Sequence, residues 1–336
     1  MNEILVTGCA GFIGMHCVER LLARGEQVVG IDNLNAYYDV ALKQARLARL
    51  TARPGFRFER VDLADRAGMA DLFARVQPRR VLHLAAQVGV RYSIDAPDIY
   101  TDANLLGFGH VLQGCRAARV EHLVFASSSS VYGGNAKMPF AESDAVDHPI
   151  SYYAATKKAN EVMAHSYAHL YAMPCTGLRF FTVYGPWGRP DMALFKFTRA
   201  MLAGEPIDVY GQGRLVRDYT YIDDIVEGVL RVLDKPATPD AAYDALRPSP
   251  GASSAPYRIF NIGNSTPTVL MDYIQAIESA LGRGADKRLL PMQAGDMHST
   301  AADTSALAAW VDFAPATPVG EGVARFVHWY REFYKV

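Results

Sequence analysis

A tyrosine and a lysine four positions apart are the clearest candidates for acid/base chemistry in this sequence. On a helix, Tyr153 and Lys157 would lie one above the other on the same face. A free phenol has a pKa of about 10, and a neighbouring ammonium group favours the phenolate and lowers that pKa. Such a pair could take a proton from an alcohol or sugar hydroxyl and return it. The same spacing is common on solvated helix faces, so it indicates acid/base chemistry only when the surrounding elements also indicate a ligand site.

A glycine-rich turn follows the first predicted strand. Residues Glu3–Thr7 predict a short buried strand, and residues 15–24 predict a helix. Between them, Gly8, Gly11 and Gly14 have the spacing G-x-x-G-x-x-G. In this strand–turn–helix context, glycines let the backbone approach a pyrophosphate, which then lies at the helix N-terminus. The alternative is a glycine-rich turn that binds no ligand.

The second predicted strand, Gln27–Asp32, ends at an acidic residue that Asn33 follows. A carboxylate at this point can accept hydrogen bonds from both ribose hydroxyls of an adenosine. It would repel a 2′-phosphate, which favours NAD over NADP. Position alone leaves open that Asp32 caps a helix instead.

Predicted strands and helices then alternate as far as Phe180. The predicted strands are 56–61, 80–84, 121–126 and Cys175–Phe180, and the predicted helices are 64–76, 102–118 and 151–171. This alternation indicates an α/β protein with a parallel, doubly wound sheet. The serines at 127–130 would follow the carboxyl end of a buried strand, where such sheets bind ligands. A polar turn is the alternative explanation for them.

The alternation ends after Phe181, and the remaining pattern does not assign a fold. Helices are predicted within 182–203 and at 222–233, 269–281 and Val319–Tyr334, and strands at 207–210 and 258–262. Residues 234–257 are rich in proline, alanine and serine, which predicts an exposed loop.

The composition is that of an ordinary globular protein. The 336 residues are 50% hydrophobic and 21% charged, with a net charge of −1, which argues against a nucleic-acid surface. No apolar run of about 18 residues predicts a membrane span. The first strand begins so close to Met1 that no signal peptide is expected. Cys9, Cys17, Cys115 and Cys175 form no metal-type cluster and are interpreted as free thiols of a cytoplasmic protein.

The chain as a whole resembles the extended short-chain dehydrogenase/reductase family and, within it, the nucleotide-sugar epimerases. This resemblance is carried by Gly8, Gly11, Gly14, Asp32, the serine run, Tyr153, Lys157 and the sequence Arg-Asp-Tyr-Thr-Tyr-Ile-Asp-Asp at 217–224. Segments 89–93, 185–193 and 290–296 resemble the UDP-glucuronate 4-epimerases. The resemblance implies a Rossmann-type doubly wound parallel sheet with a smaller mixed α/β substrate-binding domain. The NAD-binding domain would comprise 1–181 and also receive 214–262, and the UDP-sugar-binding domain would comprise 182–213 and 263–336.

The activity that the resemblance implies is reversible epimerisation at carbon 4 of UDP-glucuronate to UDP-galacturonate through a 4-keto intermediate. Tyr153 would take the proton of the 4-hydroxyl while NAD accepts the hydride. Lys157 would bind the nicotinamide ribose and lower the pKa of the tyrosine, and Ser128 would hold the same hydroxyl. The keto sugar would then turn about its link to the diphosphate and receive the hydride on its other face.

The resemblance also implies two sets of binding residues. The residues implied to contact NAD are Gly8, Gly11, Phe12, Ile13, Gly14, Asp32, Asn33, Asp62, Leu63, Leu84, Ala85, Ala86, Gln87, Asn104, Tyr153, Lys157 and Phe180. The residues implied to contact the UDP-sugar are Arg91, Ser128, Ser129, Ser130, Thr182, Arg189, Lys196, Arg217 and Asp296. Arg217 is implied to bind the pyrophosphate through bidentate geometry, and Asp296 the uridine ribose. For each basic residue, a solvated surface charge is the alternative.

Two residues depart from the pattern of epimerases that act on neutral UDP-hexoses. The chain has Thr182 where those enzymes usually have asparagine, and Gln293 where they usually have arginine. A hydroxyl at Thr182, together with Ser129 and Ser130, could hold a carboxylate at carbon 5. A 4-keto uronate is a β-keto acid that can lose carbon dioxide, so the hypothesis is that these three residues clamp the carboxylate, with Arg189 as a further candidate.

Several alternatives remain open from the sequence. UDP-glucose 4-epimerase is the nearest, and Thr182 and the sequence pattern at 185–193 oppose it. UDP-glucuronate decarboxylases and sugar 4,6-dehydratases typically have an acidic residue where this chain has Ser129 and Ser130. A non-catalytic NAD-sensing protein would typically lack the tyrosine or the lysine. The resemblance also implies a homodimer formed through helices 105–118 and 151–171, although sequence cannot distinguish a face buried in a dimer from one buried in the monomer.

Overall fold

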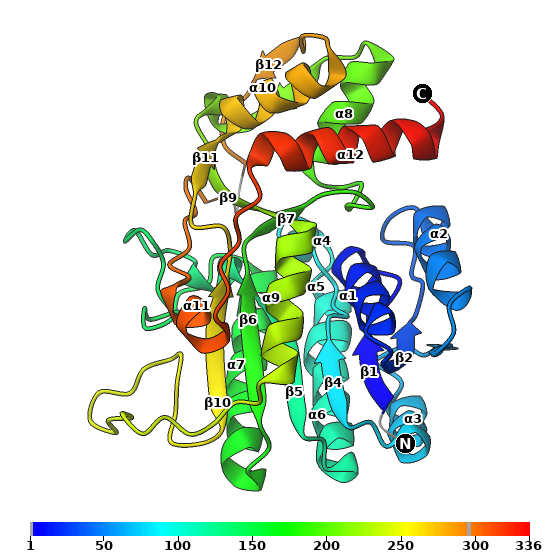
Figure 1. Ribbon diagram of the computed structural model, residues 1–336. Helices are drawn as coiled ribbons and strands as arrows, with labels where there is room; N and C mark the ends of the chain where they lie inside the picture. Colours follow the sequence, from blue (N-terminus) through cyan, green and yellow to red (C-terminus); the bar gives the residue numbers. More distant parts are fainter. Residues whose placement is uncertain (1–2, 294–296) are drawn as a thin grey trace.

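The computed structural model describes residues 3–293 and 297–336. Its centre is a seven-stranded sheet in the order β10-β6-β5-β4-β1-β2-β3, and all of its pairings are parallel (Figure 1). The strands are β1 (Glu3–Thr7), β2 (Gln27–Asp32), β3 (Phe56–Arg60), β4 (Arg80–His83), β5 (His122–Ser128), β6 (Cys175–Phe180) and β10 (Tyr257–Ile262). The prediction of a doubly wound parallel sheet is confirmed.

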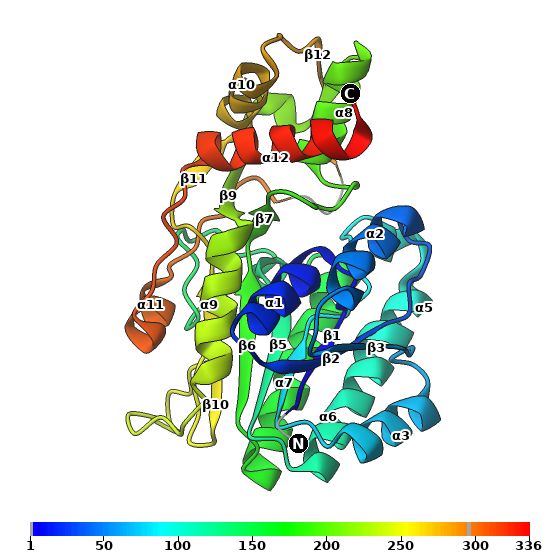
Figure 2. The ribbon, with the colours of Figure 1, turned by 45° about the vertical axis from the view of Figure 1, so that its right-hand side comes forward.

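Helices cover both faces of this sheet, which explains why its central strands are nearly continuous apolar runs (Figure 2). The helices α1 (Phe12–Ala23), α2 (Val40–Thr51) and α9 (Ile222–Asp234) lie on one face. The helices α3 (Arg66–Val76), α6 (Gly107–Ala118) and α7 (Tyr152–Tyr171) lie on the other. Within the described residues, no helix has both the length and the hydropathy that crossing a membrane requires.

Several element bounds differ from the prediction. Helix α1 begins at Phe12 rather than at Met15, because Gly11 is its N-cap. The helix predicted at 102–118 is divided into a π-helical segment, Thr101–Leu106, and α6. Two further short helices, α4 (Tyr92–Asp95) and α5 (Pro97–Tyr100), precede it. Strand β5 extends through Ser128, so the first two serines of the run belong to the strand.

The smaller part of the molecule is built on two short sheets above the carboxyl edge of the large one (Figure 1). One sheet has the order β11-β9-β7, from Pro267–Val269, Val216–Tyr221 and Thr182–Tyr184. The other pairs β8 (Ile207–Val209) with β12 (Lys287–Leu289). Helices α8 (Ala193–Ala203), α10 (Leu270–Leu281) and α12 (Val319–Tyr334) cover these sheets, whereas α11 (Ser305–Val311) lies beside β10. After α9 the chain runs through 235–256 without helix or strand, which confirms the predicted loop.

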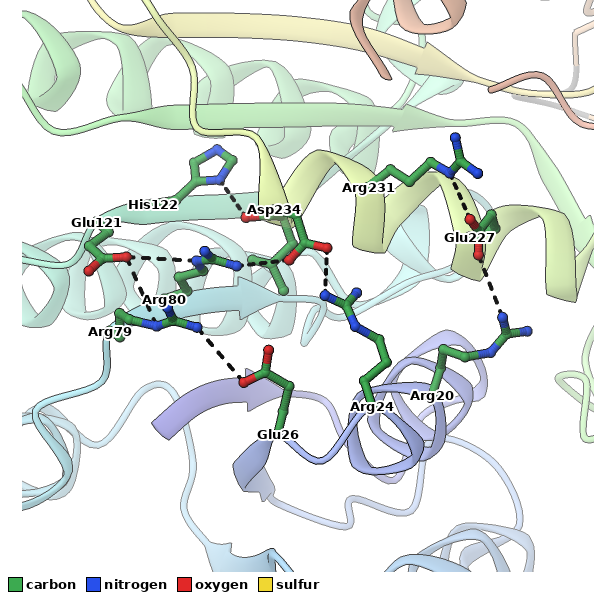
Figure 3. A network of polar contacts seen from close by, with 11 residues as sticks. Arg20, Arg24, Glu26, Arg79, Arg80, Glu121, His122, Glu227, Arg231 and Asp234 are labelled. Carbon is green, nitrogen blue, oxygen red and sulfur yellow. Dashed lines mark hydrogen bonds and ion pairs between the residues drawn. The ribbon is translucent and has the colours of Figure 1, made fainter. Parts of the chain in front are cut away.

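An ion-pair network holds α9 against α1 and the amino ends of the strands (Figure 3). The carboxylate of Asp234 accepts from Arg24 of α1 at 2.6 Å and from Arg80 of β4 at 2.8 Å. Beside it, His122 of β5 is buried between Leu233 and Thr176 and contacts the carbonyl of Leu233 at 3.2 Å. Exposed ion pairs of this kind contribute little individually, but together they fix the helix that follows β9 onto the helix that follows the glycine turn.

Candidate active site

The first turn of α7 places Tyr153 at the carboxyl end of β5. Ser151 is the N-cap of this helix, and its hydroxyl accepts from the backbone N–H of Ala154 at 3.1 Å. The backbone N–H of Tyr153 donates to the hydroxyl of Ser93 at 3.2 Å. The side chains of Tyr153 and Ser128 share a hydrogen bond, although they come from different elements. The structure therefore brings the predicted tyrosine and the second serine of the run into direct contact.

Lys157 lies one turn further along α7 and is buried. Its ammonium group donates to the carbonyl of Ala126, in β5, at 3.0 Å. Burial lowers the pKa of Lys157 to about 8. Burial and the charge of Lys157 lower the pKa of His83 to about 3, and this imidazole contacts the hydroxyl of Thr7 at 2.8 Å. The ends of β1, β4 and β5 thus meet around the lysine.

The pKa of Tyr153 is subject to opposing influences. Burial raises this pKa, while the hydrogen bond from Ser128 and the charge of Arg189 lower it. The ammonium group of Lys157 is directed at the carbonyl of Ala126, and its effect on the pKa of Tyr153 stays a prediction. A positive charge placed beside the phenol would lower its pKa.

The glycine turn fits a dinucleotide pyrophosphate. Gly8 has φ +73°, and a Cβ there would lie 2.8 Å from the backbone nitrogen of Ala85. A Cβ on Gly14 would lie 2.1 Å from the carbonyl oxygen of Gly8. The N-cap, Gly11, offers no side-chain acceptor to the first turn of α1. Unfilled N–H groups at a helix N-terminus attract an anion, which is the chemistry that a pyrophosphate needs.

Asp32 ends β2 beside this turn. Its carboxylate accepts from the backbone N–H groups of Leu34 at 2.8 Å and Ala10 at 3.2 Å. Burial raises its pKa, and the backbone bonds and the charges of Lys43 and Arg46 lower it. The next helix, α2, is capped by Asp39 instead, whose side chain accepts from Ala41 at 2.9 Å. The alternative that Asp32 is a helix cap is therefore excluded.

Asn104 connects two of the segments predicted to contact the cofactor. Its side chain donates to the carbonyl of Gln87 at 3.0 Å and accepts from the N–H of Gln87 at 2.8 Å. It also donates to Thr156 of α7 at 3.1 Å, and Asn160 donates to the Asn104 carbonyl at 2.7 Å. The remaining predicted residues lie at the same edge: Phe12 and Ile13 in the first turn of α1, Asn33 after β2, Asp62 and Leu63 after β3, Leu84, Ala85 and Ala86 after β4, and Phe180 at the end of β6.

The predicted carboxylate clamp lies at the ends of two neighbouring strands. Ser129 and Ser130 begin a 3₁₀ turn directly after β5, and the N–H of Ser130 donates to the Ser128 hydroxyl at 3.2 Å. Ser128 is the register partner of Phe180 in β6, and Thr182 follows two residues later as the first residue of β7. The side chains of Ser129, Ser130 and Thr182 are all half-buried.

The predicted basic residues occupy different environments. Arg189 is bound by both oxygens of Asp191, at 3.0 and 2.5 Å, and its charge acts on Tyr153. Arg217 donates to the carbonyls of Met297 at 2.7 Å and His298 at 3.2 Å. The exposed Arg91 stacks on the ring of Tyr210 at 5.4 Å. Lys196 is exposed on α8, and Asp296 lies outside the described residues.

Sequence reasoning missed the segment between β2 and β3, including α2. Tyr37 donates to Asp191 at 3.4 Å, and Arg46 of α2 is fully buried. The spacing of Leu42, Arg46 and Leu50, four apart after a capping aspartate, was an available signal for a buried helix face.

Comparison with known proteins agrees with this geometry. The family model described as "NAD dependent epimerase/dehydratase family" matches residues 4–263. An uncharacterised 37.6 kDa protein of Escherichia coli O111:H- is 60% identical over 99% of this chain and 100% of its own length. A probable UDP-glucuronate 4-epimerase of Rhizobium meliloti (strain 1021) is 49% identical over 98% of this chain and 97% of its own.

A solved structure extends the likeness to the whole fold. The UDP-glucuronic acid 4-epimerase of Bacillus cereus, crystallised with UDP-glucuronic acid and NAD, superposes with a TM-score of 0.88. It is 30% identical, and the match covers 99% of this chain and 100% of that one. The family model alone spans well over half of the sequence, and the matched region contains the glycine turn, the serine run and the tyrosine–lysine pair. This chain belongs to the NAD dependent epimerase/dehydratase family.

Proposed function

We propose that the protein interconverts UDP-glucuronate and UDP-galacturonate by epimerisation at carbon 4, with NAD as its retained cofactor. The observation that carries this proposal is the hydrogen-bonded pair of Tyr153 and Ser128 beside buried Lys157. The pair lies at the carboxyl edge of the large sheet, where the glycine turn also lies. Full-length similarity to UDP-glucuronate 4-epimerases, one of them crystallised with UDP-glucuronic acid and NAD, supports the substrate and the cofactor.

The residues that would hold NAD come from two strand ends and from helix α7. The turn from Gly8 to Gly14 would carry the pyrophosphate, Asp32 the adenosine ribose, and Lys157 the nicotinamide ribose. Bound NAD supplies a reversible hydride acceptor and a positive charge. That charge would lower the pKa of Tyr153, which burial raises in the protein by itself.

Proton transfer is the part of the reaction that the protein performs. The phenolate of Tyr153 takes the proton of the 4-hydroxyl, and the hydroxyl of Ser128 holds the same oxygen in place. The phenol returns the proton to the carbonyl oxygen after the keto sugar has turned its other face to the cofactor. Because hydride would leave one face of carbon 4 and return to the opposite face, the configuration at that carbon would be inverted and no external oxidant would be consumed.

The proposed substrate contacts continue from Tyr153 toward the smaller part of the molecule. Arg217 would bind the diphosphate, since a guanidinium group matches two phosphate oxygens. Arg189, whose charge already acts on Tyr153, lies at the sugar end. Arg91, Lys196 and Asp296 are proposed to contact the nucleotide or the uronate on the resemblance alone.

Loss of the proposed carboxylate clamp should expose the β-keto acid to decarboxylation. The variant Thr182→Val removes one hydroxyl at nearly constant volume. We expect weaker binding of UDP-glucuronate, by about 1 kcal/mol for one lost hydrogen bond, and release of carbon dioxide with a UDP-keto-pentose. Measuring labelled carbon dioxide and KM together tests this. Unchanged KM with no carbon dioxide above the wild-type level would remove Thr182 from the clamp.

The function itself is tested by incubating the purified protein with UDP-glucuronate, UDP-galacturonate and UDP-glucose, without added NAD, and separating the products by chromatography. We expect the two uronates to interconvert and UDP-glucose to remain. Conversion of UDP-glucose to UDP-galactose would instead support the UDP-glucose 4-epimerase alternative, and a UDP-pentose the decarboxylase. A protein that retains NAD but gives no product would be a non-catalytic sensor.

A homodimer is proposed on the apolar side chains that α7 and the π-helical segment expose. Val162, Leu170 and Tyr171 of α7 and Leu106 are exposed in the monomer, which favours a second copy packing through this face. Sedimentation of Leu170→Asp should show a monomer where the wild type is a dimer. Leu246→Asp is the matched control, because Leu246 is 91% exposed on the 235–256 loop. A monomeric wild type would exclude the dimer.

A cytoplasmic location is also proposed. Cys9, Cys17, Cys115 and Cys175 are buried and unpaired, as expected of a protein from a reducing compartment.

A further inference from the structure

The guanidinium group of Arg46 connects two loops that lie far apart in the sequence. It is fully buried in α2. It donates to the carbonyl of Ala10, in the glycine turn, at 3.2 Å. It also donates to the carbonyl of Trp187 at 2.7 and 3.1 Å and to that of Gly188 at 3.1 Å. The phenol of Tyr38 accepts its fifth bond at 2.6 Å. All five N–H donors of the arginine are therefore used.

The segment that Arg46 binds is held from both sides. Trp187 has φ +63°, an unfavourable conformation for a bulky residue. Its ring packs on Trp329 and Phe333 of α12, at centroid distances of 5.2 and 4.9 Å. On the cofactor side, burial lowers the pKa of His16 to about 4, and this neutral imidazole donates to the carbonyl of Pro186 at 3.0 Å. The loop at 186–188 therefore contacts α1, α2 and α12.

The same loop leads to Arg189, whose charge lowers the pKa of Tyr153. Arg189 follows Gly188 directly and is oriented by Asp191. Tyr37, from the segment after β2, also donates to Asp191 at 3.4 Å. Hydrogen bonds therefore connect the glycine turn, through Arg46, to the carbonyls of Trp187 and Gly188. Arg189 is the next residue of the chain, and its charge lowers the pKa of Tyr153.

The buried positive charge of Arg46 should respond to an anion bound at the glycine turn. Within the described residues, its hydrogen-bond partners are three carbonyls and a phenol, none of them a carboxylate. The charge of Arg46 already acts on the buried carboxylate of Asp32, which lies beside the same turn and whose pKa it lowers. A second anion close by would further reduce the cost of burying this cation. The turn that Ala10 belongs to is the turn that fits a pyrophosphate.

We propose that Arg46 is a positioning residue that couples NAD on the glycine turn to the loop carrying Arg189, and through it to binding of the UDP-sugar. The inference rests on the proposed function, since it needs both ligands. It requires that each ligand strengthens binding of the other, because coupling between two sites is reciprocal.

The test measures NAD release from the holoenzyme with and without saturating UDP. Released NAD is trapped by alcohol dehydrogenase and ethanol and followed by its reduction. We expect UDP to slow release from the wild type by about tenfold, within the usual range of coupling between two sites. In Arg46→Met, basal release should be faster and the effect of UDP should fall to about twofold or less. The informative quantity is the ratio of the NAD release rate without UDP to the rate with UDP. A general loss of stability would raise both rates and leave this ratio unchanged.

Two further variants make the outcome specific. Arg49→Met alters the same helix and the same loop, because Arg49 stacks on the ring of Trp187 at 5.1 Å but binds none of its carbonyls. It should keep the wild-type ratio. Arg46→Lys keeps the charge but not the planar set of donors. It should therefore show the reduced effect of UDP on NAD release while releasing NAD more slowly than Arg46→Met. This variant also replaces Arg46→Met if that variant does not fold.

Three results would overturn the proposal: a wild type whose NAD release is unaffected by UDP, an Arg46 variant with the wild-type ratio, or an equal loss in Arg49→Met. Each is distinct from failure of the proposed function. A wild type that epimerises UDP-glucuronate but shows no effect of UDP on NAD release retains its function and loses only this role of Arg46.

Discussion

Replacing Tyr153 with phenylalanine should lower kcat by about 10²–10⁴-fold, the usual contribution of a positioned acid/base group. The variant keeps the ring that packs edge-on against Tyr100 at 6.2 Å, so NAD retention and the melting temperature should change little. It removes the hydroxyl that Ser128 contacts. The loss should therefore appear in kcat rather than in KM or in stability.

The pH dependence gives this prediction a second readout. The phenolate is the base, so wild-type kcat should rise as the pH rises through the pKa of Tyr153 in the complex. Burial raises that pKa in the protein by itself, and the positive charge of bound NAD opposes the rise. The phenylalanine variant has no group that titrates at this position and should lack the rise.

The adjacent tyrosine provides a matched control. Tyr152 is exposed, and its hydroxyl contacts Thr101 at 2.6 Å rather than the serine run. Tyr152→Phe should keep the wild-type kcat and pH profile. If Tyr153→Phe turned over UDP-glucuronate at near the wild-type rate, another group would have to take the proton, and the proposed mechanism would be wrong.

The second large effect is expected from a buried ion pair beneath the active site. Glu161, one turn after Lys157 on α7, accepts from Arg179 of β6 through both oxygens at 2.9 Å. It also accepts from Ser127 at 2.6 Å, and Arg179 donates to the phenol of Tyr132 at 3.0 Å. Burial lowers the pKa of Arg179, but Glu161 and Tyr132 more than offset this and hold the pKa above its ordinary value. The pair joins α7, β6, the first serine of the run and the last residue of the 3₁₀ turn that follows β5.

Arg179→Met should lower the free energy of unfolding by about 3–5 kcal/mol, because it leaves a buried carboxylate without its counterion. Chemical denaturation at one fixed NAD concentration measures this, since NAD binding itself stabilises the folded state. The matched double variant Glu161→Leu/Arg179→Met removes both charges and should recover most of the loss, to within about 1–2 kcal/mol of the wild type. A double variant as unstable as the single one would show that packing, not the unpaired charge, is responsible.

Local sequence determined the large sheet, the glycine turn and the position of the tyrosine–lysine pair. Strands buried on both faces must be continuous apolar runs, and the turn needs glycine at position 14, where a Cβ would lie 2.1 Å from the carbonyl oxygen of Gly8. These requirements act within a few residues, so β1, β2 and β6 could be predicted without a structure. The segment of α2 obeys similar rules, with Asp39 as its cap, but its buried face contains Arg46, which interrupts the apolar pattern.

Only the tertiary structure decided how the chemical groups meet. Sequence spacing placed Tyr153 and Lys157 on one helix face. Only packing brings the phenol of Tyr153 to Ser128 and directs the ammonium group of Lys157 at the carbonyl of Ala126. Arg46 reaches carbonyls 141 and 142 positions away along the chain. Hydrogen bonds over such separations depend on which helix faces are brought together, and no local pattern of residues encodes that.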